Sequence, residues 1–423
     1  MENVTFLIIA LLFILLGLIS KKIKHSIITA PMVFVLIGLL FGSDIFGIID
    51  INFDSKTIRI IAELTLVLVL FSDASRIQVK TLVKEHNIPL RLLTIGLPLT
   101  MVLGSALCFW LFEGLSIWQA AIVGIILTPT DAALSHSVVG IKEVPVRVRQ
   151  SLNIESGLND GLVVPFLIVF LSYANVFEKN MSLGKWFILL LSNILVGIII
   201  GIIIGYVGGK IFEKSIQKKW TSSTFSKIAT IALALLAYAS AQLLWGNGFI
   251  AAFVAGITIA HTSKPLVEVI HDFAAIEGQF FALLLFLVFG LSIAGPIIFS
   301  LTLKEVVYAL LSLTLVRMIP VWISLIGCKL KWQTYLYFGW FGPRGIASIV
   351  FSLMIVEQNI IPQALRIFMI CGATILFSIY LHGLTAYPGA IWYAKTIQPK
   401  WTKRFAEHKK VFPFPTRYHN NNH

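Results

Sequence analysis

The chain has 423 residues, of which 57% are hydrophobic and only 13% are charged. Soluble domains carry roughly a quarter charged residues, so this composition excludes an ordinary soluble globular protein. The net charge of +13 would suggest nucleic acid as the partner of a soluble protein. In a membrane protein the same excess is explained by basic cytoplasmic loops, so we expect a lipid bilayer and no nucleic acid.

The apolar residues form runs of about 17 to 25, the length that crosses a hydrocarbon core. The alternating pattern of membrane β-barrel strands is absent from the sequence. We therefore predict an all-α polytopic membrane protein with about thirteen spans. The predicted spans are residues 4–20, 26–42, 57–73, 89–112, 116–139, 153–174, 184–209, 226–244, 246–262, 272–295, 305–327, 332–356 and 362–386.

The predicted loops alternate along the chain between a set that is rich in lysine and arginine and a set that has few of them. One set is basic and includes Lys21, Arg76 and Lys214, whereas the opposite set has few cations, such as Lys179 and Lys304. This alternation predicts an odd number of spans in the cell (inner) membrane, with the N-terminus outside and the C-terminus in the cytoplasm. Residues 391–423 are predicted to form a short basic cytoplasmic tail.

The fifth predicted span contains a helix break. Pro129 removes a helix hydrogen bond and clashes with the preceding turn. Thr128, Thr130 and Asp131 place oxygen atoms at this break. Because irregular backbone in a membrane is tolerated only inside protein or beside a cavity, the break is a candidate functional site.

The sixth predicted span begins with four polar residues that are costly to bury. Glu155 and Asn159 are separated by one helical turn, and so are Ser156 and Asp160. The two pairs are offset by one residue and fall on one broad face. Ionisable groups at membrane depth are functional candidates, so we expect this face to line a polar cavity.

A second break is predicted in the twelfth span, where Pro343 and Arg344 lie between two glycines. If the seventh span is a linker, spans 1–6 and 8–13 are two halves, and each break falls in the fifth span of its half. Matched interrupted spans are typical of inverted-repeat transporters, so we predict two inverted six-helix repeats.

Hard oxygen ligands from Asp160, Asp131, Ser156 and Thr130 suit a small cation such as Na⁺. Burial generally raises the pKa of a carboxyl group, so one aspartate can hold a proton or a cation in turn. This competition predicts exchange of Na⁺ for H⁺ with no cofactor besides the transported ions. The neutralised states cross a membrane more cheaply than a bare carboxylate.

Glu155 requires a partner, because a lone buried charge is costly. Arg344 and Arg317 are the intramembrane cations available, and a structural ion pair is favoured over a transport role for Glu155. Arg317 has an alternative, since a long side chain can extend to the cytoplasmic surface. Asp73 lies near the cytoplasmic end of the third span and either lines an entry path or is a helix-end charge.

Three motifs resemble the cation:proton antiporter family, and specifically its electroneutral sodium/proton exchanger branch of prokaryotic type. They are Thr-Pro-Thr-Asp in span 5, Glu-Ser-Gly-Leu-Asn-Asp in span 6 and Gly-Pro-Arg-Gly in span 12, and the similarity covers about residues 1–390. The resemblance implies a homodimer with a mobile core of spans 4–6 and 11–13. It also implies a dimerisation domain of spans 1–3 and 8–10, a linker at span 7, and crossed broken helices at spans 5 and 12.

By position in these motifs, Asp160 would be the essential carboxylate for the cation and proton. Asp131, Thr130 and Ser156 would complete the site. Asn159 stands where the electrogenic branch has an aspartate, which implies electroneutral exchange. Asp73 lies where some members have an additional acidic ligand.

The resemblance also implies that Glu155 pairs with Arg344 or Arg317. The family often has Gly-Leu-Arg-Gly where this chain has Pro343, so the local bend is expected to differ.

Alternative functions remain open on the sequence alone. A K⁺/H⁺ or mixed monovalent cation antiporter differs only in cavity geometry. A sodium-coupled symporter for an organic solute requires a second polar patch, which the spans lack. A membrane-embedded enzyme is disfavoured, because no metal-ligand cluster or nucleophile triad is found.

Overall fold

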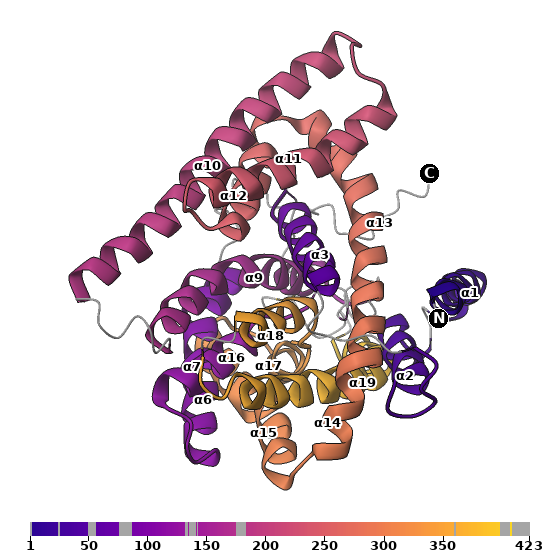
Figure 1. Cartoon of the computed structure of the whole chain (residues 1–423), viewed down its shortest axis with the longest axis vertical. Coiled ribbons are helices and arrows are strands. Elements are labelled where there is room, and N and C mark those ends of the chain that lie inside the picture. The colour runs from indigo at the N-terminus through magenta and orange to yellow at the C-terminus, as the bar shows by residue number, and fades with distance from the viewer. Residues whose placement is uncertain are drawn as a thin grey trace.

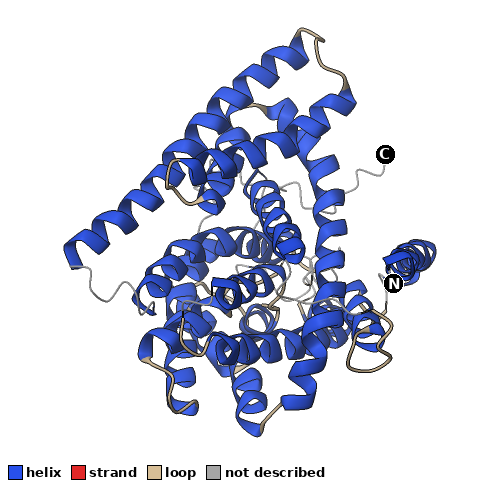
Figure 2. Ribbon diagram, in the orientation of Figure 1, coloured by secondary structure: helices blue, strands red, loops and turns tan. Residues whose placement is uncertain are grey.

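A computed structural model of the chain describes residues 2–23, 26–49, 56–75, 87–131, 134, 141, 143–174, 183–358, 361–397 and 407. Every regular element within these residues is a helix (Figure 2).

The first half of the chain, up to the long helix at the edge of the molecule, contains the following elements (Figure 1): α1 (Glu2–Ile23), α2 (Ala30–Phe41), α3 (Lys56–Ser75), α5 (Asn87–Arg91), the π-helical turn η1 (Leu92–Gly96), α6 (Leu97–Leu111), α7 (Ile117–Ile126), α9 (Val146–Ala174) and α10 (Leu183–Gln217). The second half contains α11 (Ser223–Leu243), α12 (Gly248–Thr262), α13 (Lys264–Phe289), the π-helical turn η3 (Gly290–Ala294), α14 (Gly295–Ser300), α15 (Leu303–Leu313), α16 (Leu315–Leu325), α17 (Trp332–Trp340), α18 (Ile346–Gln358) and α19 (Ala364–Thr396).

Each predicted span overlaps a helix or a run of consecutive helices in this order. Seven described helical segments are long and apolar enough to cross a membrane, and five shorter helices are apolar as well. Span 10 differs from its predicted bounds, since α13 begins at Lys264 and the helical path continues through η3 to Ser300. The helix therefore extends beyond its most apolar part at both ends.

Span 13 also exceeds its predicted bounds, because α19 continues to Thr396. Lys395 in the last turn of α19 interacts favourably with the negative end of the helix, which favours this extension. The first residues of the predicted tail are therefore helical. Beyond Ile397, only Glu407 of the tail is among the described residues.

The helices pack most extensively within two groups. One group joins α6, α7 and α9 with α15 to α19, and the other joins α2, α3, α11, α12 and α13, with α10 packed on α11 and α12. Neighbouring helices recur in the two halves of the chain: α6–α7 corresponds to α16–α17, α7–α9 to α17–α19, α3–α12 to α13–α2, and α9–α12 to α19–α2. Such recurrence is what two structural repeats related by a pseudo-two-fold axis produce.

α10 runs diagonally along the edge of the molecule (Figure 1) and packs on α12 through glycines. A methyl group in place of the α-hydrogen of Gly197, Gly201 or Gly205 would lie between 2.6 and 2.8 Å from backbone carbonyl oxygens of the α12 segment. Glycine at one-turn spacing is therefore needed for this close approach. The opposite face of α10 exposes large apolar side chains such as Ile199 and Ile203, as expected of a face in contact with lipid.

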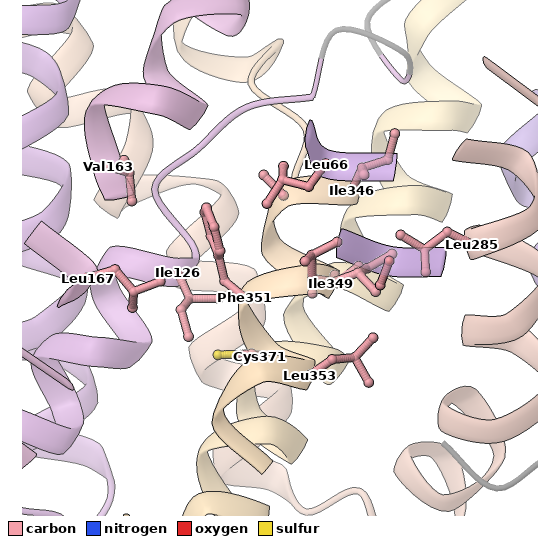
Figure 3. Packing of buried hydrophobic residues seen from close by; sticks show 14 of the residues in the cluster. Leu66, Ile126, Val163, Leu167, Leu285, Ile346, Ile349, Phe351, Leu353 and Cys371 are labelled. Carbon is pink, nitrogen blue, oxygen red and sulfur yellow. The ribbon is translucent and has the colours of Figure 1, made fainter. Parts of the chain in front are cut away.

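α18 lies in the middle of the hydrophobic core (Figure 3). Its side chain Phe351 lies near Ile126 at the end of α7 and Leu167 of α9, while Leu66 of α3 and Leu285 of α13 lie on its other side. All of these side chains are buried. The second half of the broken span 12 is thus held by both groups of helices.

Candidate functional site

α7 ends inside the protein, at the first break. The Thr128 hydroxyl donates to the carbonyl of Gly124 at 2.7 Å, and Pro129 has no N–H with which to continue the helix. Residues 127–131 are irregular and buried. The second part of the predicted span 5, beyond Asp131, lies almost entirely outside the described residues.

The second break separates α17 from α18. Residues 341–345 have no regular structure, and all five are buried. The backbone N–H of Gly342 donates to the carbonyl of Trp340 at 2.8 Å, and the next residue, Pro343, has no N–H. The break begins where the proline motif predicted it.

The two breaks contact each other and supply the hydrogen-bond partners that their helix ends lack. The Arg344 guanidinium donates to the carbonyl oxygens of Thr128 at 2.5 Å and Pro129 at 3.3 Å, just past the C-terminus of α7. The Asp131 carboxylate accepts from the backbone N–H of Ile346 at 2.7 Å, at the N-terminus of α18. Each charge has the sign that stabilises the helix end it contacts.

One further backbone contact joins the two breaks where they cross, and a second bond is local to the first break. The Asp131 N–H donates to the Pro343 carbonyl at 2.7 Å, so the two breaks pair directly. The other oxygen of the Asp131 carboxylate accepts from the N–H of Leu134 at 3.3 Å. An ionised carboxylate has about four acceptor positions, so Asp131 can accept from both N–H groups.

Gly345 is required beside the Asp131 carboxylate. A β-carbon at this position would overlap the carboxylate oxygen that accepts from Ile346. We therefore expect Gly345→Ala to lower stability by about 1–3 kcal/mol, because the cap of α18 must move. The measurement is the thermal unfolding midpoint of the purified protein in detergent.

Gly17→Ala is the matched control for Gly345→Ala, because nothing lies within 4 Å of a β-carbon at Gly17 in α1. Equal unfolding midpoints for the two alanine variants would contradict the close packing assigned to Gly345.

A cluster of three polar side chains joins the first break to α9. The Asn159 amide donates to the Thr130 hydroxyl oxygen at 2.7 Å, and the hydroxyl oxygens of Thr130 and Ser156 are 3.1 Å apart. All three side chains are buried. Since Thr130 accepts from Asn159, its own proton is available for the bond to Ser156.

Asp160 lies in α9 one turn after Ser156, in the same buried stretch. Asp73 approaches α9 from α3: a β-carbon at Gly157 would lie 3.6 Å from the β-carbon of Asp73. The Asp73 side chain is buried as well. The fold thus brings two helices with one aspartate each to the hydroxyl cluster.

Glu155 forms an ion pair with Arg317 of α16, with a distance of 2.5 Å between the carboxylate and guanidinium groups. Each side chain is only 3% exposed, so the alternative in which Arg317 extends to the cytoplasmic surface is wrong. Arg344, the other candidate partner, is directed to backbone carbonyls instead. The guanidinium of Arg317 also packs against Gly342, where a β-carbon would lie 2.6 Å from its Nε.

Two serines contact the crossing of the two breaks, and the sequence did not identify either of them as part of the site. Ser348 donates to the carbonyl of Ile126 at 2.7 Å, and the Ser378 hydroxyl accepts from the backbone N–H of Arg344 at 2.7 Å. Both lie within apolar runs, where serine commonly bonds within its own helix. Their contacts become visible only when α7, α18 and α19 are packed together.

The family profile described as "Sodium/hydrogen exchanger, transmembrane" matches residues 7–392. A K(+)/H(+) antiporter, NhaP, of Alkalimonas amylolytica is 27% identical over 400 residues, which cover 92% of this chain and 67% of that protein. The K(+)/H(+) antiporter NhaP2 of Shewanella baltica is 25% identical over 385 residues, covering 90% of this chain and 65% of that protein. A Na(+)/H(+) antiporter of Schizosaccharomyces pombe is 25% identical over 323 residues, 68% of each chain. The chain thus spans about two thirds of the length of these relatives.

The fold is similar to that of the sodium proton antiporter MjNhaP1 from Methanocaldococcus jannaschii. The TM-score is 0.74 at 21% identity, covering 90% of this chain and 100% of that chain. This likeness confirms the predicted all-α polytopic membrane fold. The match to the family profile extends over nearly the whole chain and includes both breaks and α9. The chain therefore belongs to the sodium/hydrogen exchanger transmembrane family, a family of cation:proton antiporters and not of enzymes.

Proposed function

We propose that this chain exchanges Na⁺ for H⁺ at a site centred on Asp160. The observation that carries the proposal is the hydroxyl cluster of Thr130 and Ser156, fixed by Asn159 at the crossing of the breaks. Hydroxyl and carboxylate oxygens are the ligands that hard monovalent cations prefer. Ser156 lies one turn from Asp160 on α9, so this cluster and the carboxylate face the same space.

The roles of the acidic residues differ in this proposal. Asp160 alternates between holding a proton and holding the cation, with Ser156 and Thr130 as further ligands. Asp131 both caps α18 and contributes an oxygen to the cation. Asp73 is an additional ligand from α3. A cation or a proton neutralises Asp160 in either loaded state, which lowers the cost of moving the site through the membrane.

Asn159 supports electroneutral exchange of one cation for one proton. Its amide carries no charge, and its donated hydrogen bond to Thr130 gives it a structural task in the cluster. Glu155 and Arg317 compensate each other as an ion pair, so neither adds a transported charge.

K⁺ is the second candidate cation, because relatives from Alkalimonas and Shewanella carry the name K(+)/H(+) antiporter. The proposed site combines carboxylate oxygens with the hydroxyls of Thr130 and Ser156, and such ligands accept Na⁺, Li⁺ or K⁺ according to the size of the cavity. A sodium-coupled organic solute symporter is the more distant alternative.

We further propose how the helices divide the work of alternating access. The group containing α6, α7, α9 and α15 to α19 is the mobile core that carries the ion site. The group containing α1 to α3 and α11 to α14 is the dimerisation domain of a homodimer, and α10 is the linker. The alternation of basic loops supports an N-terminus outside the cell (inner) membrane and a C-terminus in the cytoplasm.

The test uses the purified chain in lipid vesicles that hold a pH-sensitive dye and an imposed proton gradient. Adding Na⁺, Li⁺ or K⁺ outside should dissipate the gradient without any organic solute, with Na⁺ giving the lowest half-saturating concentration. Because the exchange is electroneutral, clamping the membrane potential at zero should leave the rate unchanged. A gradient that persists with each of the three cations would contradict the proposal, and a lower half-saturation for K⁺ would select the second candidate.

A further inference from the structure

In the described part of the C-terminal tail, Glu407 contacts the start of α17. It is the only acidic residue among residues 391–423, a stretch otherwise rich in lysine and arginine. Its side chain is 1% exposed. A carboxylate buried to this extent requires hydrogen-bond donors, and Glu407 finds them at the start of α17.

Glu407 caps α17. One oxygen of its carboxylate accepts from the backbone N–H of Lys331 at 2.6 Å and from the Thr334 hydroxyl at 2.8 Å. Lys331 is the N-cap residue of α17, and its own side chain makes no capping bond. Thr334 is the third residue of the helix, where a capping box would have a glutamate that reaches back to the N-cap N–H. The tail thus supplies the carboxylate that the helix itself lacks.

A continuous series of contacts leads from Glu407 along α17 to its other end. The hydroxyls of Thr334 and Tyr393 are 2.8 Å apart, and the donation from Thr334 to Glu407 makes Tyr393 the donor in that bond. The Tyr393 ring stacks on Tyr337 with centroids 4.0 Å apart. Tyr337 in turn meets the ring of Phe341 edge to face, with centroids 4.8 Å apart.

Phe341 is the first residue of the second break, and its ring fills the space beside Gly389 of α19. The following residue, Gly342, packs against Arg317 and against the methyl group of Thr130, where a β-carbon would lie 3.1 Å away. α17 has nine residues and is therefore about 13 Å long. α17 therefore links Glu407 at its first turn to the second break, which lies beside Thr130, at its other end.

We propose that Glu407 is a positioning residue for cation exchange, which fixes α17 from the C-terminal tail and so holds the second break beside Thr130. This role rests on the proposed cation site at Asp160 and Thr130. Glu407 touches no ion in this account and acts through the helix and the aromatic stack.

The test is the cation titration of the full chain in dye-loaded vesicles, with Glu407→Ala compared with wild type. The half-saturating Na⁺ concentration should rise about fivefold, the factor that corresponds to loss of a helix cap, while the maximal rate per folded protein stays within about twofold. Glu407→Gln should keep the wild-type value, because the amide oxygen can accept from both Lys331 and Thr334. Tyr393→Phe keeps the ring stack but removes one donor, and should raise half-saturation about twofold.

Glu305→Ala is the matched control, because Glu305 accepts from the N-cap N–H of Thr302 at the start of α15, away from the breaks. The half-saturating Na⁺ concentration of this variant should stay at the wild-type value.

The positioning role would be overturned if Glu407→Ala kept the wild-type half-saturating concentration, or if it lost only maximal rate. Equal defects in Glu407→Ala and Glu407→Gln would overturn it as well. If Glu407→Ala does not fold, the Gln and Tyr393→Phe variants decide the question by the same readout. Absence of exchange in the wild type would instead refute the proposed function.

Discussion

Asp160→Asn should abolish cation-dependent proton movement in vesicles, to the level of vesicles without the protein. Asparagine matches aspartate in shape, so α9 and the hydroxyl cluster are expected to remain in place. The amide carries no charge and cannot take up a proton near neutral pH, so it can neither bind the cation by charge nor carry the proton in return. Dye fluorescence after a Na⁺ pulse gives the rate directly.

Glu63→Gln is the matched acid-to-amide control for Asp160→Asn. Glu63 lies in α3 and accepts from the Tyr238 hydroxyl at 3.2 Å, outside the crossing of the breaks. Its variant should retain exchange within about twofold, because loss of one charge-assisted hydrogen bond at a half-buried site affects stability more than the cation site. Exchange by Asp160→Asn at a rate similar to that of Glu63→Gln would remove Asp160 from the mechanism.

Glu155→Gln should strongly destabilise the protein, because it leaves the Arg317 guanidinium buried without its counter-charge. Breaking one partner of a buried ion pair costs about 3–5 kcal/mol. Both side chains are 3% exposed, so water does not replace the lost carboxylate. The expected result is a lower thermal unfolding midpoint in detergent and a lower yield of folded protein.

The double variant Glu155→Gln with Arg317→Gln should recover part of the stability, because neither side chain is then charged. Glu213→Gln is the control for an exposed pair: Glu213 contacts Lys210 at 3.0 Å on the surface of α10, and such pairs contribute about 0–1 kcal/mol. A double variant less stable than Glu155→Gln alone would contradict the ion-pair account.

The helical architecture could be predicted because each span is longer and more apolar than a soluble protein permits. The two breaks could also be predicted from the sequence. Pro129 interrupts an apolar run close to Asp131, and Pro343 interrupts another next to Arg344. Helix ends were less well predicted, as the extension of α19 to Thr396 illustrates. Outside the hydrocarbon core, hydropathy no longer reports where a helix stops.

The partners of the buried charges could not be predicted from the sequence. Arg317 and Arg344 are both arginines in apolar surroundings, and only the packing of α16 against α9 and of the two breaks against each other distinguishes them. The capping of α18 by Asp131 has the same origin, because its partner Ile346 is distant in sequence. Glu407 gave no signal at all, since one acid in a basic tail is typical of a solvated end.

The mutual capping of the two breaks gives a reason for the two buried charged residues at this crossing. Arg344 and Asp131 stabilise backbone groups that a continuous helix would have satisfied itself. Their positions leave the polar groups of the crossing fixed around Thr130 and Ser156. If the proposed site lies at this crossing, we expect access to change by movement of the core as a unit.

The most direct test of competition at Asp160 is the Na⁺ titration of the wild-type vesicles at several pH values. If one carboxylate holds either ion, the half-saturating Na⁺ concentration should rise as the pH falls, approaching about tenfold per pH unit on the acidic side, while the maximal rate stays constant. A half-saturating concentration that does not change with pH while the maximal rate falls would show separate sites for the cation and the proton, and would contradict the account.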